Sequence, residues 1–181
     1  MSKAIIFLAD GFEECEGLLV ADILRRAKAE VITASINSSK SVISSHNITV
    51  QADALAEDID YSAADLIVLP GGLAGTANLA ASDLVAEQCR AFASGKKLAA
   101  ICAAPSILAS LGLLSGKRAT VHPSFESKMG DAVLTHEAVT VDGNIITGRG
   151  LGAAIPFALE LAKQLCGKET ADRIAASICY Q

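Results

Sequence analysis

The chain has 181 residues, of which 51% are hydrophobic and 19% charged, with a formal net charge of −5. This length suits one domain over residues 1–181 with a core of its own, and the composition excludes a disordered chain. Basic runs never exceed two residues and the apolar runs are too short to cross a bilayer, so we expect no nucleic-acid partner and no membrane association.

Strand-like and helix-like segments alternate in the first half of the chain. We expect a buried strand at 3–9, a helix at 16–28, a strand at 30–35, a short hairpin or excursion at 42–51 and a buried strand at 65–69. The first apolar run is too short for a signal peptide and leads into acidic residues instead of a cleavage site. We therefore expect a cytoplasmic protein.

The same alternation continues in the second half. We expect a helix at about 82–93, a strand at 97–101, a short helix from Pro105, a strand at 119–121, a polar hairpin at 132–147 around Asp142-Gly143, and helices at about 153–165 and 169–178. Such an order predicts an α/β fold, with a mostly parallel central sheet and helices on both faces.

Chemically useful residues follow the predicted strands. Acidic residues at 10–16 follow the first strand, Gly71-Gly72 follows 65–69, Cys102 follows 97–101, and His122 follows 119–121. In open α/β sheets, ligands bind outside the carboxyl ends of the strands. We therefore expect a carboxylate cluster, a diglycine turn, a cysteine and a histidine to meet at one edge.

Small residues flank Cys102 on both sides, in the sequence AICAAP at 100–105. This pattern is typical of a sharp strand–nucleophile–helix turn, which exposes the nucleophile and lets the helix N-terminus favour a thiolate. The alternative is a buried cysteine at the end of a strand. Likewise, Gly71-Gly72 is either a donor of backbone amides to an anion or simply a tight turn.

His122 is either a general acid–base group or a structural histidine before proline. The glutamates at 13, 14 and 16 are either a solvated helix start or, for one of them, a proton carrier beside Cys102. The five cysteines are odd in number and lack a C-x-x-C pair or any Cys/His pair with ligand spacing. We therefore expect neither a disulfide framework nor a metal site.

Five motifs, taken together, resemble those of the ThiJ/PfpI superfamily, and most closely its DJ-one-like branch, the parkinsonism-associated deglycase and its bacterial relatives. They are FLADGFEECE (7–16), VLPGG (68–72), AAICAAP (99–105), HP (122–123) and TGRG (147–150). The match covers essentially the whole chain, with the motifs in order. It implies a flavodoxin-like three-layer sandwich, a homodimer and no cofactor.

The resemblance also implies roles for individual residues. It implies that Cys102 is the reactive, easily oxidised cysteine, that Glu16 bonds to its sulfur, and that His122 lies nearby. The amides of Gly72 and Ala103, next to Gly71, match the anion-binding pair of the family. Two arginines match a dimer or anion site, namely Arg26 near the subunit interface and Arg149 before the last helices.

Two departures from the family pattern matter. His46 stands where many members carry an arginine, in the excursion expected to reach the partner subunit, which weakens an anion site shared with Arg26. Ala103 follows the nucleophile where the protease branch has a histidine, which argues against peptidase activity.

Three functions follow as hypotheses. The favoured one is a cofactor-independent enzyme acting on small α-oxoaldehydes, converting methylglyoxal to lactate or removing related adducts. The second is a sensor of oxidative stress or a redox-regulated chaperone that uses Cys102 without significant turnover. The third and weakest is amidotransferase-like hydrolysis, for which the sequence offers no obvious Cys-His-Glu triad.

Overall fold

Seven strands form the central sheet of the protein, whose computed structural model describes residues 2–180. In spatial order they are β10 (Val139–Asp142), β11 (Ile145–Gly148), β7 (Lys97–Ile101), β6 (Leu66–Leu69), β1 (Lys3–Leu8), β2 (Glu30–Ser35) and β5 (Ala54–Leu55). All neighbouring pairs are parallel except β10 and β11, which form an antiparallel hairpin at the edge. The predicted mostly parallel sheet is confirmed.

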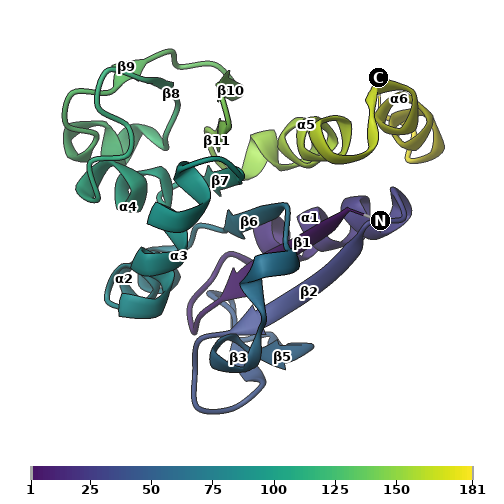
Figure 1. The fold of residues 1–181 in the computed structure, drawn as a ribbon, viewed down its shortest axis with the longest axis horizontal. Coiled ribbons are helices and arrows are strands. Elements are labelled where there is room, and N and C mark those ends of the chain that lie inside the picture. Colours follow the sequence, from purple (N-terminus) through teal and green to yellow (C-terminus); the bar gives the residue numbers. More distant parts are fainter. Residues whose placement is uncertain (1, 181) are drawn as a thin grey trace.

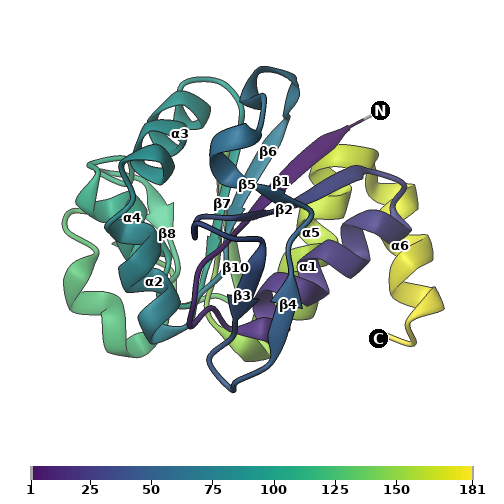
Figure 2. The same ribbon diagram turned by 90° about the horizontal axis from the view of Figure 1, so that it is seen from below.

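Helices cover both faces of this sheet, and Figure 2 shows the three layers side-on. On one side lie α1 (Glu14–Arg26), α5 (Ala154–Cys166) and α6 (Lys168–Ser177); on the other lie α2 (Leu73–Ala80), α3 (Asp83–Ala93) and α4 (Pro105–Ser110). Short 3₁₀ turns complete the chain, at η1 (Ala56–Asp58), η2 (Tyr61–Ala63), η3 (Pro123–Lys128) and η4 (Leu151–Ala153).

Strand β1 shows why an unbroken aliphatic run becomes a central strand. Successive side chains point to opposite faces, so Ile6 and Leu8 join the core beneath α1 and α5, while Ile5 and Phe7 join the core beneath α3 and α4. All four are fully buried. Because both faces of the strand are covered, polar alternation is absent from its sequence.

Two small sheets lie outside the central one. Strands β3 (Ser41–Ile43) and β4 (Thr49–Gln51) form the hairpin expected at 42–51. Strands β8 (Arg118–Ala119) and β9 (Val133–Leu134) pair in parallel beside β10, as Figure 1 shows. The strand predicted at 119–121 is therefore only partly present: of its residues only Ala119 is in a strand, and that strand pairs with β9.

Two further expectations need correction. Helix α2 was not predicted, because its sequence LAGTANLA contains glycine and threonine and lacks a clear helical stripe. The hairpin expected at 132–147 is formed by 139–148, and its second strand, β11, is fully buried rather than polar. The turn at Asp142-Gly143 is present, but β11 pairs with β7 inside the main sheet.

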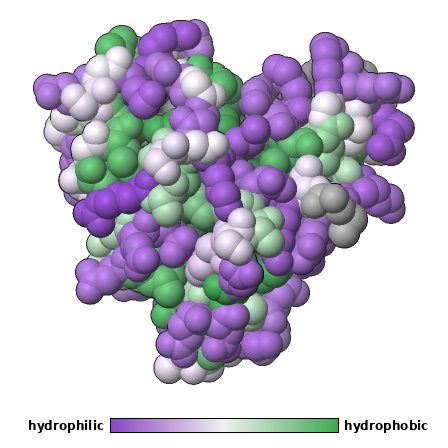
Figure 3. Space-filling model, in the orientation of Figure 1, coloured by the Kyte–Doolittle hydropathy of each residue, from purple (hydrophilic) through white to green (hydrophobic). Residues whose placement is uncertain are grey.

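Exposed apolar side chains are few. The face in Figure 3 is mostly hydrophilic, with hydrophobic side chains in small patches. Among the residues described, the large hydrophobic side chains that are exposed are Ile43, Ile48, Leu73, Val133, Leu151 and Tyr180. No helix within residues 2–180 combines the length and the apolar character needed to cross a bilayer.

Candidate active site

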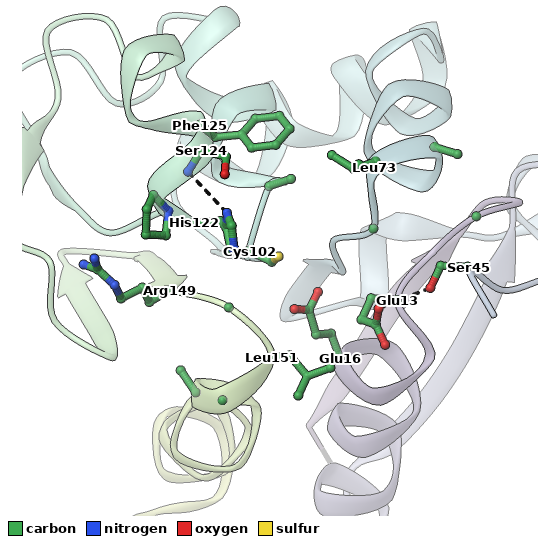
Figure 4. A pocket seen from close by; sticks show the side chains of 18 of the residues that line it. Glu13, Glu16, Ser45, Leu73, Cys102, His122, Ser124, Phe125, Arg149 and Leu151 are labelled. Carbon is green, nitrogen blue, oxygen red and sulfur yellow. Dashed lines mark hydrogen bonds between the residues drawn. The ribbon is translucent and has the colours of Figure 1, made fainter.

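A cavity of about 1080 Å³ opens at the carboxyl ends of the central strands, and Figure 4 shows it from close by. Six predicted site residues line it. One is Arg149, which follows β11, and the other five are Glu16, Gly72, Cys102, Ala103 and His122. They come from α1 and from the loops after β6, β7 and β8. The convergence expected from the strand order is therefore present in the structure.

Cys102 occupies a sharp turn between β7 and α4. Its backbone φ is 64°, in the left-handed region that residues with a side chain seldom adopt. Two backbone hydrogen bonds hold it there: its own N–H donates to Gly148 (2.9 Å), and its carbonyl accepts from the N–H of His122 (2.8 Å). The predicted elbow is thus formed, and the sulfur points toward Glu16 in Figure 4.

The carboxyl group of Glu16 is fully buried beside this sulfur. Its Oε2 accepts a hydrogen bond from the backbone N–H of Gly71 at 2.8 Å. A Cβ atom at residue 71 would lie 2.5 Å from this oxygen and 2.6 Å from the Cβ of Cys102. Only glycine leaves room for the carboxyl group and the thiol to meet.

Burial raises the pKa values of both partners. Desolvation raises the pKa of Glu16 to about 7, although hydrogen bonds from Cys102 and Gly71 oppose the change. Desolvation, and then the charge of Glu16, raise the pKa of the Cys102 thiol to about 12. The amides at the helix N-terminus act in the expected direction and lower the pKa of Cys102, but burial beside a carboxylate outweighs them.

The pair nevertheless shares one proton in a useful way. Because the two groups are in contact, they titrate as a unit, and the first proton leaves near neutral pH. The remaining proton can lie on either group. When it lies on the carboxyl group, the sulfur is a thiolate that accepts a hydrogen bond from Glu16.

Backbone amides also face the sulfur. Hydrogen bonds from Ala103 and Gly72 lower the pKa of Cys102, against the larger effect of burial. Gly72 has a φ of 92°, and a Cβ there would collide with the backbone of Gly11, so glycine is required. These two amides are the pair that the sequence pointed to, and Gly71 serves instead to bind Glu16.

His122 lines the cavity from the far side of Cys102. Its Nδ1 accepts a hydrogen bond from the N–H of Ser124 at 3.3 Å, so in the neutral ring the proton lies on Nε2. His122 can therefore donate a hydrogen bond into the cavity. Its backbone position is fixed by its bond to Cys102.

The two predicted arginines lie in different places. Arg149 lines the cavity opposite Glu16, with Nη2 3.9 Å from Glu126. Arg26, in the last turn of α1, pairs with Asp22 at 2.7 Å and is absent from the cavity lining. The structure does not bring the two arginines together.

Sequence reasoning missed a group at the cavity mouth. His46 Nδ1 lies 2.7 Å from Glu14 Oε1 and 3.9 Å from Glu13 Oε2, and Ser45 lies between them. In residues 2–180 this is the one set of three side chains whose atoms are close enough to hold a metal ion. The signal was hidden because residues 13–14 and 46 are distant in sequence.

The remaining cysteines lie apart from this site. Cys89 is buried in α3 and Cys166 ends α5, while Cys15 and Cys179 are exposed. Burial raises the pKa values of Cys89, to about 12, and of Cys166. Within the described chain all five cysteines are free thiols.

Comparison with known proteins supports the family resemblance that the sequence motifs indicated. A family model described as DJ-1/PfpI family matches residues 2–164. Protein dj-1beta of Drosophila melanogaster is 40% identical over 98% of this chain and 97% of its own. Deglycase TK1284 of Thermococcus kodakarensis is 33% identical over 90% of this chain and 99% of its own.

Solved structures agree in fold. The crystal structure of Drosophila melanogaster DJ-1beta superposes with a TM-score of 0.96 at 38% identity, over 100% of both chains. The solved structure of oxidised Toxoplasma gondii DJ-1 gives a TM-score of 0.95 at 35% identity, over 99% of both chains. The flavodoxin-like α/β fold implied by the motifs is thereby confirmed. The chain belongs to the DJ-1/PfpI family.

Proposed function

We propose that this protein is a cofactor-independent, cysteine-dependent enzyme that acts on α-oxoaldehydes and converts methylglyoxal to lactate. The observation that carries the proposal is the buried contact between the Cys102 sulfur and the Glu16 carboxyl group, at the floor of an open cavity. A nucleophile hydrogen bonded to an acid–base group is the arrangement that covalent catalysis needs.

The first step forms a carbon–sulfur bond. The thiolate of Cys102 adds to the aldehyde carbon, and the carbonyl oxygen becomes the hydroxyl of a hemithioacetal after it takes up a proton. The amides of Gly72 and Ala103, already directed at the sulfur, are placed to stabilise negative charge as it develops. The carboxyl group of Glu16 supplies this proton and becomes a carboxylate, while the N–H of His122 can donate a hydrogen bond to the oxygen.

The next steps move protons and then release the product. Glu16, now a carboxylate, removes the proton from the carbon bonded to sulfur, which gives an enediol. Glu16 returns a proton to the neighbouring carbon, so that carbon is reduced while the former aldehyde carbon is oxidised to a thioester. Water then cleaves the carbon–sulfur bond, releasing lactate and restoring the thiol.

Lactate formation from methylglyoxal tests this proposal. The wild-type protein should form lactate with saturable kinetics and without added cofactor. Cys102→Ser should reduce the rate by a factor on the order of 10³ or more, because the hydroxyl is a much weaker nucleophile than a thiolate. A wild-type rate no greater than that of Cys102→Ser would refute the enzyme.

A second candidate function is a sensor of oxidative stress. One observation favours it: Cys102 is partly accessible from the cavity, and its relative from Toxoplasma gondii is described as oxidized. Mild peroxide should then convert Cys102 to a sulfinate before it modifies the other cysteines. Peptide mass spectrometry that finds Cys89 or Cys179 oxidised first would contradict this role.

We also propose that the protein is a cytoplasmic homodimer of single-domain subunits, with α1 in the interface. Ile43 and Ile48, on the β3–β4 hairpin beside α1, are about half exposed, at 47% and 49%. Covering exposed apolar side chains with a partner subunit is favourable, because it removes apolar surface from water. A monomeric mass by light scattering at micromolar concentration would contradict the dimer.

A further inference from the structure

Cys102 keeps a backbone conformation that other parts of the fold must hold in place. Its φ of 64° lies in the left-handed region, which is unfavourable for a residue with a side chain. Two backbone hydrogen bonds hold it there, one to the carbonyl of Gly148 and one from the N–H of His122. Gly148 belongs to β11, a buried strand of the main sheet. His122 lies outside that sheet and needs support of its own.

His122 follows a segment that has no place in the hydrogen-bond ladder of the main sheet. Strand β8 pairs with β9 in a separate sheet, and two residues separate β8 from His122. The hydroxyl of Thr147, in β11, accepts a hydrogen bond from the backbone N–H of Thr120 at 2.9 Å. A side chain thereby supplies the acceptor that a neighbouring strand would otherwise provide. Thr147 thus ties the segment that carries His122 to the central sheet.

Burial makes this bond hard to replace. Thr120 and Thr147 are each only 1% exposed, so water cannot take the place of either group. A second side chain of the same hairpin, Asp142, accepts a hydrogen bond from the N–H of Arg118 at 2.8 Å, but that bond is exposed and lies further from His122 along the chain. A buried N–H that loses its acceptor bears the full cost of its desolvation. The position of His122 therefore depends more on Thr147 than on Asp142.

Thr147 and Gly148 are consecutive in β11, and together they hold the turn at Cys102 from both ends. The carbonyl of Gly148 accepts a hydrogen bond from the N–H of Cys102 at 2.9 Å. The hydroxyl of Thr147 holds the segment whose last N–H, that of His122, donates to the carbonyl of Cys102 at 2.8 Å. A shift of that segment is therefore transmitted to Cys102 through a single hydrogen bond.

We propose that Thr147 is a positioning residue that holds the backbone of Cys102 in its left-handed conformation. It acts through the N–H groups of Thr120 and His122, and so keeps the sulfur directed at Glu16. Thr147 itself is absent from the cavity lining. Its hold on the backbone does not depend on the proposed function, whereas its effect on turnover rests on that function.

Two substitutions at residue 147 separate the hydroxyl from the rest of the side chain. Thr147→Val keeps the branched shape but removes the acceptor, whereas Thr147→Ser keeps the acceptor but removes a buried methyl group. Hydrogen exchange by NMR should show the amides of Cys102 and His122 exchanging at least about tenfold faster in Thr147→Val, relative to the amides of β1, which report global stability. In Thr147→Ser the global stability falls, but this ratio should stay as in the wild type.

Thr120→Val is the matched control. The hydroxyl of Thr120 is buried without a hydrogen-bond partner among residues 2–180, while its backbone N–H is the group that Thr147 binds. The substitution removes the same kind of hydroxyl from the same place and leaves the bond intact. It should not change the exchange of Cys102 and His122 relative to β1. Equal acceleration in Thr120→Val and Thr147→Val would overturn the proposal, because the bond would then not be the cause.

Turnover is the second readout. With methylglyoxal, Thr147→Val should lower kcat by about tenfold and leave KM within about twofold, because the reacting groups are displaced while the cavity lining is kept. Thr147→Ser should restore kcat to within about twofold of the wild type. Unchanged exchange at Cys102 and His122 in Thr147→Val, or an unchanged kcat, would overturn the positioning role. If the wild-type protein forms no lactate but the selective exchange is observed, the proposed reaction fails and the role of Thr147 stands.

Discussion

The cavity has two sides that are built in different ways. Its sheet side is the set Glu16, Gly71, Gly72 and Cys102, held by the loops after β6 and β7 and by α1. Its outer side is the set Ser45, His46, Arg149 and Leu151, carried by the β3–β4 turn and by the segment before α5. Glu16 is fully buried, whereas the side chain of His46 is 66% exposed.

Two glycines show the difference in available space. A Cβ at Gly71 would collide with Glu16 and Cys102, whereas a Cβ at Gly152, on the outer side, would meet nothing within 4 Å. The sheet side therefore admits one arrangement of its atoms. The comparison indicates that the closely packed edge of the sheet fixes the positions of the reacting groups. The outer side has room for other side chains, so its residues can differ with the ligand that is bound.

Among changes on the sheet side that keep the nucleophile, Glu16→Gln should give the largest effect. The amide keeps the shape and can donate a hydrogen bond to the sulfur, but it cannot carry a proton back and forth. We expect turnover of methylglyoxal to fall by about 10² or more, as for the loss of a general acid–base group. Steady-state lactate formation measures this loss.

The same variant separates proton transfer from nucleophile reactivity. Because the charge of Glu16 raises the pKa of Cys102, a neutral amide should leave alkylation by iodoacetamide near neutral pH as fast as in the wild type, or faster. Near-normal turnover in Glu16→Gln would show that Glu16 is only a structural partner of the sulfur, and the redox-sensor function would then be favoured.

The burial of Glu16 should also appear in the pH dependence of stability. Its pKa is about 7 in the folded protein, against an ordinary value of 4.5, so folding favours the protonated form. This contribution is fully present below pH 4.5 and is lost as the pH rises through 7. Relative to the wild type, Glu16→Gln should gain about 1 to 3 kcal/mol between pH 4.5 and 8, measured by urea unfolding. A pH-independent difference would contradict the assigned burial.

Gly71→Ala and Gly152→Ala form a matched pair across the cavity. The methyl group at residue 71 must displace Glu16 or Cys102, so kcat/KM for methylglyoxal should fall by about tenfold or more. The same methyl group at residue 152 has open space and should change kcat/KM less than about twofold. Equal losses of kcat/KM in the two variants would show that the two sides of the cavity do not differ in the space they leave for a methyl group.

His46→Ala should have the smallest effect. The pair joins the exposed His46 to the buried Glu14 and contributes about 1 kcal/mol or less, so the urea midpoint should move little. Turnover of methylglyoxal should also stay within about twofold, because His46 lies on the outer side. A large loss of turnover would place His46 among the groups that act on the substrate.

Much of the sheet side could be predicted from the sequence, because its signals are local. Strands β2 and β7 have the predicted bounds, and Cys102 and Gly71-Gly72 follow buried strands directly. The strand order then brings them together without further information. The residues alone left three glutamates as candidates for the partner of the sulfur, and the family resemblance singled out Glu16.

The outer side could not be predicted in the same way. The hairpin at 42–51 was expected, but its turn folds His46 back onto Glu14 of the same chain, a contact between distant segments. The pairing of β8 with β9 and of β11 with β7 is likewise decided by tertiary packing. Even on the sheet side, the direction of the Cys102 pKa shift depended on a burial that no local pattern reports.

The left-handed backbone conformation of Cys102 lowers the stability of the fold at the residue that the proposed activity requires. A residue with a side chain at a φ of 64° costs about 1 kcal/mol or more compared with glycine, so Cys102→Gly would relax the turn while removing the nucleophile. Selection for thermal stability alone would favour that exchange. A population of variants screened only for heat resistance should therefore accumulate glycine at residue 102, and retention of cysteine there would report selection for chemistry.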